Sequence, residues 1–350
     1  MLDTMPLSHD RPFRLAIIGA GMVSETLHVP AALASPRVDI VALVDPQIGR
    51  AERLAHDYGL QPRLAARAEE VLDFVEGVII ATPNNSHRDI AIACAKRGVH
   101  CLIEKPLATS VAEAEDICRA AETSGIVVAV GYSTRFRDEV DLVRDVVRSG
   151  AFGAVLRFHF QEGTVGGWSP VSAYNLDRKA AGGGVLSIVG AHFLDRMLYW
   201  FGYPDEVELE DDGYAGPEAQ AFVTVRYRSS GRNFEGTIRL SKLFHLKAGF
   251  VMETDDGTFV LPIGASPLRF LPNHNPDLQL TLQPRGGPRY PAGKDNFQIQ
   301  LEDFIEACRG NRQPLVTARQ GLESIRLLEH LYRGRRPLSD ASQNTSNGPG

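Results

Sequence analysis

The sequence predicts an α/β fold with two domains: a doubly wound parallel sheet at the N-terminus, and a C-terminal α+β domain with an open, mainly antiparallel sheet. Two patterns predict this. Apolar runs alternate with amphipathic segments of helical length over residues 13–130, and segments of alternating polar and apolar residues follow. A chain of 350 residues with 43% hydrophobic content can bury a core in each domain.

The N-terminal pattern contains five apolar runs that we interpret as strands. Their near-continuous hydrophobicity suits parallel strands that are covered on both faces. The segments between them have helical periodicity, and Ser86 and Ser110 are suitable N-caps. We expect strands at 13–18, 38–44, 77–80, 99–103 and 126–130, and helices at 22–34, 47–58, 86–97 and 110–124.

The pattern changes after a connecting helix that we expect at 137–149. A helix at 185–201 interrupts a series of antiparallel strands, and "DDG" at 255–257 predicts a hairpin turn. Two helices, at about 295–309 and 317–333, are expected to close this domain. The predicted strands are 154–161, 219–228, 233–241, 249–254, 257–261 and 278–283.

These patterns set the expected domain boundaries. We place the first domain, with the doubly wound sheet, at residues 1–132 and the second, with the antiparallel sheet, at 133–338. The tail, 339–350, has nothing apolar enough to pack, so we expect it to be disordered.

Composition favours a cytoplasmic protein that binds small molecules. No apolar run reaches the roughly 18 to 20 residues of a membrane span, and the N-terminus lacks the apolar core of a signal peptide. A net charge of −6, with only "RGRR" at 333–336 as a basic cluster, argues against nucleic acid. Neither metal ligation nor disulfide pairing is suggested by the spacing of Cys94, Cys101, Cys118 and Cys308.

The stretch "LAIIGAGMVSE" at 15–25 follows a predicted strand and opens a predicted helix. Gly19 permits the tight turn, and Gly21 lets main-chain N–H groups approach a pyrophosphate at the helix N-terminus. Ser24 replaces the third glycine, a position that governs packing more than phosphate contact. We assign Gly19, Gly21, Met22 and Val23 to the cofactor.

Asp45 ends the second predicted strand, where its carboxylate can accept both ribose hydroxyls of adenosine. A carboxylate there repels a 2′-phosphate, so NAD is favoured over NADP, although Arg50 could weaken that preference. The alternative is a flavodoxin-like or other α/β sheet that has a chance pair of glycines and a surface aspartate.

Two more loops follow predicted strands at the edge where doubly wound sheets bind ligands: "ATPNNSH" at 81–87 and "EKP" at 104–106. The 37 basic residues comprise 31 arginines and only 6 lysines. A lysine is therefore used where its compact ammonium is needed, which favours a functional role for Lys105 over a solvated loop position.

Together these motifs resemble the glucose–fructose oxidoreductase, inositol dehydrogenase and rhizopine-catabolism (Gfo/Idh/MocA) family from Phe13 to about Pro337. The resemblance implies an N-terminal Rossmann domain and a C-terminal sheet whose free face forms a homodimer or homotetramer interface. It rests on "GAGMVS", "ATPNNSH", "EKPLATSVAEAE", "VGYSTRF", "SGAFGAV", "AGGGVLSIVGAHFLD" and "GRRP".

By the same resemblance, Glu104 and Lys105 lie beside the nicotinamide ribose, and Lys105 points towards the substrate hydroxyl. The family oxidises or reduces pyranoses, inositols and related polyols at a secondary carbon. The residues implied to line the nicotinamide half of the cofactor are Thr82, Pro83, Asn84 and His87.

The helix after "GGG" at 182–184 carries the expected base, His192, whose pKa suits proton transfer near neutral pH. The family usually has an aspartate four positions earlier, about one helical turn away, but this chain has Ile188 there. Asp195 could orient the His192 ring or could be an ordinary polar helix residue.

The segment "AYNLDRKAAGGG" resembles the place where many family members carry an aromatic residue, a basic residue and an aspartate. Tyr174, Asn175 and Asp177 fill these places here, and we assign them to the substrate. Because Asn175 replaces the basic residue, a phosphorylated or carboxylated substrate is disfavoured at that point. Arg135 and Trp168 are further candidates.

Three functions are compatible with these residues. The first is an NAD-dependent oxidoreductase that acts on a neutral sugar, glycoside or cyclitol, with Lys105 and His192 handling the proton. The second is a non-catalytic sensor that resembles the fungal galactose-regulon repressor, which the loss of the acid at Ile188 would suit. The third is a redox-neutral step through a 3-keto intermediate.

Overall fold

The computed structural model describes residues 11–166, 176–214, 216–229, 231–262, 264, 267–310 and 312–339. The chain forms two compact units. The first comprises residues Met1–Phe136 and Pro291–Ile325, and the second Arg137–Tyr290 and Arg326–Gly350. The predicted tail at 339–350 lies outside the described residues except for Ser339.

The first unit is built on a six-stranded parallel sheet with strand order β3-β2-β1-β4-β5-β6. The chain proceeds outwards from β1 in one direction and then, after a crossover, in the other, which is the doubly wound arrangement. The carboxyl ends of β1 and β4 therefore lie side by side at the reversal. The strands are β1 (Phe13–Ile18), β2 (Val38–Val44), β3 (Arg63–Ala65), β4 (Gly77–Ile80), β5 (His100–Ile103) and β6 (Val128–Val130).

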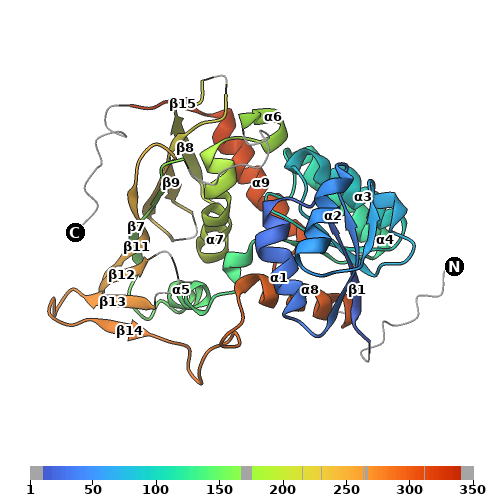
Figure 1. The fold of residues 1–350 in the computed structure, drawn as a ribbon. Coiled ribbons are helices and arrows are strands. Elements are labelled where there is room, and N and C mark those ends of the chain that lie inside the picture. Colours follow the sequence, from blue (N-terminus) through green and yellow to red (C-terminus); the bar gives the residue numbers. More distant parts are fainter. Residues whose placement is uncertain are drawn as a thin grey trace. The chain divides into compact units, whose positions relative to one another are not determined.

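Helices accompany this sheet, and Figure 1 shows them around it. Ser110 accepts a hydrogen bond from Glu113 N, which confirms it as the N-cap of α4, whereas the Ser86 side chain makes no capping bond. The helices are η1 (Ser24–His28), α1 (Val29–Leu33), α2 (Ile48–Asp57), η2 (Ala68–Glu70), η3 (Asn84–Ser86), α3 (His87–Lys96), α4 (Val111–Ser124), η4 (Ser133–Arg135) and α8 (Asn296–Arg309).

Helix α8 corrects the predicted domain boundaries. We expected the helix at 295–309 to close the second domain, but the structure groups it with the first unit. Phe304 of α8 is fully buried in the core of the parallel sheet, and its ring centroid lies 6.0 Å from that of Phe13 on β1. The apolar face of α8 thus completes the core that the N-terminal segment leaves open. The second boundary falls within α9 (Ala318–Arg333), after Ile325.

The second unit contains a nine-stranded sheet with order β14-β13-β12-β11-β7-β10-β9-β8-β15. The β7–β10 and β8–β15 pairs are parallel and the other pairs are antiparallel. This confirms the predicted fold class. The strands are β7 (Val155–Gly163), β8 (Glu206–Asp211), β9 (Gln220–Tyr227), β10 (Phe234–Ser241), β11 (Leu246–Thr254), β12 (Gly257–Pro262), β13 (Leu268–Pro272), β14 (Leu280–Leu282) and β15 (Arg336–Pro337).

One face of this sheet packs against helices α5 (Asp138–Ser149) and α7 (Ala191–Phe201). Buried aromatic side chains join the two layers: the rings of Phe160 on β7 and Phe193 on α7 stack with centroids 3.8 Å apart. Trp200 donates from Nε1 to the Val140 carbonyl at 2.8 Å, which ties α7 to α5. The shorter helices are α6 (Arg178–Ala181) and the π-helix η6 (Leu186–Gly190).

In the described parts of the chain, no helix has both the length and the apolar character needed to cross a membrane.

Candidate active site

The glycine-rich turn after β1 has the geometry that a dinucleotide site needs. Gly19 adopts φ +100°, and a Cβ there would lie 2.5 Å from the Ala81 carbonyl oxygen, so only glycine fits. Beside Gly21, in contrast, a Cβ would meet no atom within 4 Å. This open space beside a helix start is where a pyrophosphate fits.

Ser24, which replaces the third glycine, has a structural role. Its side chain is fully buried, and Oγ donates to the Gly19 carbonyl at 2.5 Å. The Ser24 side chain therefore stabilises the glycine turn through this hydrogen bond. Met22 and Val23, also predicted to bind the cofactor, are half-buried between Gly21 and η1.

Asp45 connects the glycine turn to the end of β2. Oδ2 accepts from Ala20 N at 3.0 Å and Oδ1 accepts from Gln47 N at 2.8 Å. The side chain is only 6% exposed, yet each carboxylate oxygen can accept a second hydrogen bond. The residues present therefore fit a dinucleotide with free ribose hydroxyls. Arg50 is half-buried in the first turn of α2.

The loop after β4 contains three of the predicted cofactor residues. Thr82 is half-buried, Pro83 is exposed and Asn84 is buried. Ser86 Oγ donates to Thr82 Oγ1 at 2.7 Å, and this bond closes the turn ahead of α3.

His87 requires a correction. We expected it to line the nicotinamide half of the cofactor, but its ring is fully buried and has no surface for a ligand. Nε2 lies 3.0 Å from the Thr82 carbonyl and Nδ1 lies 3.1 Å from the Pro106 carbonyl. Burial lowers the pKa of His87. The ring therefore fastens the loop after β4 to the loop after β5.

A buried pair that the sequence did not reveal fixes the loop after β5. His28 Nε2 lies 2.8 Å from Glu104 Oε1, while Glu104 Oε2 accepts from Lys105 N at 3.1 Å. Burial alone would raise the pKa of Glu104, but the hydrogen bond and charge of His28 and the charge of Lys105 hold it below its usual value. The ionised Glu104 thus positions the main chain of Lys105.

His28 lies on η1 and is 2% exposed, with its ring edge-on to Phe297 of α8 at 5.2 Å. In the sequence, His28 is distinguished only by its place in an apolar stretch of the helix after the glycine turn. Lys105 itself is half-buried, and a cis peptide bond joins it to Pro106.

In the second unit, Gly183 and Gly184 of the glycine triplet at 182–184 make room for Tyr332 and Glu218. A Cβ on Gly184 would collide with the main-chain oxygen and nitrogen of Glu218, and one on Gly183 would collide with the Tyr332 hydroxyl. The close approach at these two glycines is therefore made to protein atoms of the same unit.

Glu218 caps the helix that carries His192, and sequence reasoning missed it. Its carboxylate accepts from Gly184 N at 2.9 Å, from Leu186 N at 3.0 Å and from the Tyr332 hydroxyl at 2.7 Å. Its carbonyl accepts from Val185 N at 2.8 Å. Three N–H groups that would lack partners at a helix start are thereby satisfied. Burial raises the pKa of Glu218.

The helix begins as the π-helix η6, which contains Ile188, and continues as α7, which contains His192. A π-helical turn bonds i to i+5, so the α-helical spacing that predicted a shared face for 188 and 192 does not hold strictly here. Both side chains are half-buried. Asp195 is fully buried, on the interior side of α7.

The predicted substrate residues fall in different places. Tyr174, Asn175 and Trp168 lie outside the described residues. Asp177 is the N-cap of α6, where its carboxylate accepts from Lys179 N at 2.8 Å and from Ala180 N at 3.4 Å. Arg135 is buried at the end of η4 in the first unit.

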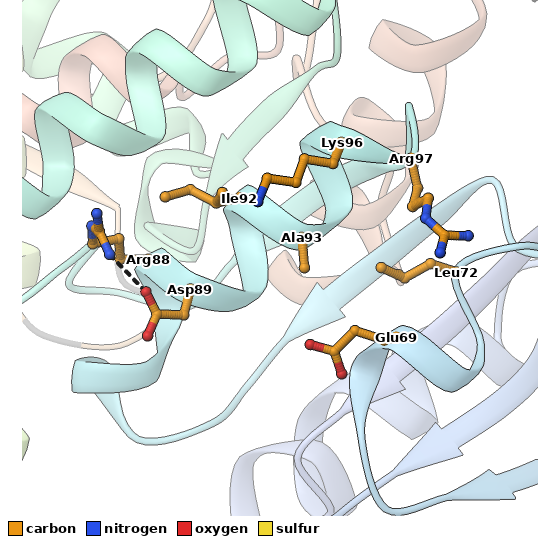
Figure 2. A pocket seen from close by; sticks show the side chains of 8 residues that line it. All are labelled: Glu69, Leu72, Arg88, Asp89, Ile92, Ala93, Lys96 and Arg97. Atoms are coloured by element: carbon orange, nitrogen blue, oxygen red, sulfur yellow. Dashed lines mark hydrogen bonds and ion pairs between the residues drawn. The ribbon is translucent and has the colours of Figure 1, made fainter.

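A hollow of about 560 Å³ lies beside α3 and η2, and Figure 2 shows its lining. Arg88 forms an ion pair with Asp89 there, and none of the predicted site residues belongs to the lining. Its side chains are Glu69, Leu72, Arg88, Asp89, Ile92, Ala93, Lys96 and Arg97.

Comparisons with known proteins agree with this geometry. Rhizopine catabolism protein MocA from Rhizobium meliloti is 28% identical over 324 residues, which are 91% of this chain and 93% of that protein. D-glucoside 3-dehydrogenase from Escherichia coli is 29% identical over 203 residues, 55% of each protein.

The fold is similar to the crystal structure of aldose-aldose oxidoreductase from Caulobacter crescentus complexed with glycerol. The TM-score is 0.80 at 23% identity, over 93% of this chain and 97% of that one. Residues 13–132 match the oxidoreductase family with an NAD-binding Rossmann fold, and residues 140–257 match the GFO/IDH/MocA C-terminal domain. The chain therefore belongs to the Gfo/Idh/MocA family of oxidoreductases and has that family's NAD-binding Rossmann fold.

Proposed function

We propose that this oxidoreductase moves hydride between NAD and a secondary carbinol or ketone carbon of a neutral sugar, glycoside or cyclitol. One observation carries the proposal: one of only six lysines stands at the carboxyl end of β5, with its main chain bonded to a buried, ionised glutamate. Relatives named for sugar chemistry, such as D-glucoside 3-dehydrogenase, support the substrate class.

In this proposal Lys105 and His192 divide the proton chemistry. When bound, the nicotinamide accepts or returns the hydride. Lys105 donates a hydrogen bond to the substrate oxygen and stabilises the alkoxide that develops there. His192, half-buried at the start of α7, accepts the hydroxyl proton. Glu104, held by His28, and Glu218 position these two groups without touching the substrate.

A substrate screen tests the proposal. Neutral sugars and cyclitols are incubated with NAD, and the absorbance of reduced nicotinamide is followed. We expect His192→Ala to lower turnover by about a hundredfold or more, because the base is lost. His245→Ala is the matched control, since His245 is an exposed histidine of the same unit.

Two outcomes would contradict the proposal. Equal turnover by wild type and His192→Ala would remove His192 as the base. Tight NAD binding without turnover of any compound would favour a sensor that does not catalyse, a reading that the apolar Ile188 in the family's acid position also suits.

The preference for NAD over NADP rests on Asp45. We expect wild type to bind NAD at least about tenfold more tightly than NADP, because the Asp45 carboxylate repels a 2′-phosphate. Asp45→Asn should reduce that ratio by about tenfold in calorimetric titrations. Asp39→Asn removes an exposed acid from the same strand and should leave the ratio unchanged. Tighter binding of NADP by wild type would refute the assignment.

Two further predictions accompany the proposed function. The second sheet face carries half-buried side chains, including Val251, Val260 and His159, which are neighbours on adjacent strands. That surface suits the predicted homodimer or homotetramer. The cytoplasmic location likewise stays a prediction.

A further inference from the structure

Arg196 is a nearly buried cation on the helix that carries His192. It is the sixth residue of α7 and is 9% exposed. Its guanidinium carbon lies 5.4 Å from the ring centroid of Phe193, 5.6 Å from that of Phe160 and 5.8 Å from that of Trp200. Aromatic faces at such distances stabilise a desolvated guanidinium, so this side chain has a defined place.

Most of its hydrogen-bonding capacity is unused. A guanidinium has five N–H donors, and only Nε is engaged, by the His192 carbonyl at 3.3 Å. Among the residues that the structure describes, none accepts a hydrogen bond from Nη1 or Nη2, and none forms an ion pair with Arg196 within 4.0 Å. Neither nitrogen is among the buried polar atoms that lack a partner, so both reach the exposed part of the side chain, where their donors are open to a ligand.

The free donors lie on the side of the helix that presents His192. Residues four apart share one face of an α-helix, and their rise along the axis is about 6 Å. The bond from Nε to the His192 carbonyl shows that the Arg196 side chain runs back towards that turn. His192 is half-buried and Arg196 is 9% exposed, so both side chains reach the surface within one turn of α7.

The surrounding charges favour a neutral ligand. Burial lowers the pKa of Arg196 to about 10, so the side chain remains cationic at neutral pH. Glu162, Asp195 and Glu139 attract it through space, and only Arg137 opposes them. An incoming carboxylate would be repelled by these three acids. Uncharged hydroxyl oxygens can accept its hydrogen bonds without that repulsion.

We propose that Arg196 binds substrate by donating from Nη1 and Nη2 to two adjacent hydroxyl oxygens of a neutral polyol. The planar fork of the guanidinium matches two neighbouring oxygens, which a lysine ammonium cannot do. The inference deepens the proposed function and rests on it for the class of substrate. Arg196 would select polyols that carry a vicinal diol about one helical turn from the carbon beside His192.

Binding, measured separately from turnover, tests this inference. NAD-saturated protein is titrated by calorimetry with myo-inositol and with methyl β-D-glucopyranoside. We expect Arg196→Met to raise Kd for the polyol that wild type binds by about ten- to a hundredfold, as for lost hydrogen bonds to a charged group. Arg196→Lys keeps the charge but loses the fork and should still raise Kd by about tenfold.

Arg232→Met is the matched control. Arg232 also bonds a carbonyl of α7, that of Phe201 at 2.5 Å, and lies over the Tyr227 ring at 4.9 Å, but at the far end of the helix. We expect it to leave Kd unchanged.

Unchanged Kd in Arg196→Met would overturn the inference, as would an equal rise in Arg232→Met or the absence of binding of both polyols to wild type. If Arg196→Met fails to bind NAD or to fold, an unchanged Kd in Arg196→Lys overturns it instead. Polyol binding that depends on Arg196 without any reduced nicotinamide would refute the proposed function and leave this inference standing.

Discussion

Lys105→Met is expected to lower kcat by about two to four orders of magnitude, while the affinity for NAD changes by less than about tenfold. Methionine keeps the length of the side chain but removes the ammonium that stabilises the alkoxide. The loop itself should persist, because Glu104 bonds the main-chain nitrogen at 105 and His28 holds Glu104 from the other side. Steady-state appearance of reduced nicotinamide measures kcat, and calorimetry measures NAD affinity.

Lys96→Met is the control for this change. Lys96 is an exposed lysine of α3 that borders the hollow in Figure 2 and belongs to the same unit. Its replacement should leave both constants unchanged. If Lys105→Met kept more than half of the wild-type kcat, or if Lys96→Met lost as much, Lys105 would not act on the reacting oxygen.

Gly184→Ala is expected to lower the free energy of unfolding of the second unit by about 3 kcal/mol or more. The added methyl collides with main-chain atoms of Glu218, which cannot rotate away as a flexible side chain can. The shift also weakens the bonds from Gly184 N and Leu186 N to the Glu218 carboxylate. Helix η6, which leads into His192, therefore loses its cap.

Tryptophan fluorescence during urea unfolding measures this change, because both tryptophans, Trp168 and Trp200, belong to the second unit. Gly216→Ala provides the comparison. A Cβ at Gly216 would meet no atom within 4 Å, so the same substitution in the same unit should change stability by less than about 0.5 kcal/mol. Equal unfolding midpoints for the two variants would show that the approach to Glu218 carries no strain.

The predictable parts of this protein are those set by local pattern. Continuous apolar runs predicted the central parallel strands, and the glycine turn with Asp45 predicted the dinucleotide site, because each depends on residues within about thirty positions. Strand β3 was missed, since three residues, Arg63–Ala65, are too few to show a period. Strands β8 and β13, at Glu206–Asp211 and Leu268–Pro272, were also missed.

The rest depends on contacts between distant residues, which no local pattern records. His28 meets Glu104 across 76 positions, and Glu218 meets Gly184 across 34. Burial likewise decided the role of His87, whose sequence neighbours suggested a ligand contact. A motif thus marks where a site lies, but it does not distinguish residues that face the ligand from those that hold the loops.

The place of α8 bears on how the protein is made. The first unit is discontinuous, because Leu301, Phe304 and Ile305 of α8 complete a core whose other buried members lie between Phe13 and Ala129. During synthesis, residues 13–132 leave the ribosome long before α8 does. The part of their apolar core that α8 covers therefore stays exposed while the second unit emerges. The cofactor-binding half of the protein is therefore translated first but completed late, and a nascent chain that stops before Asn296 has no finished first unit.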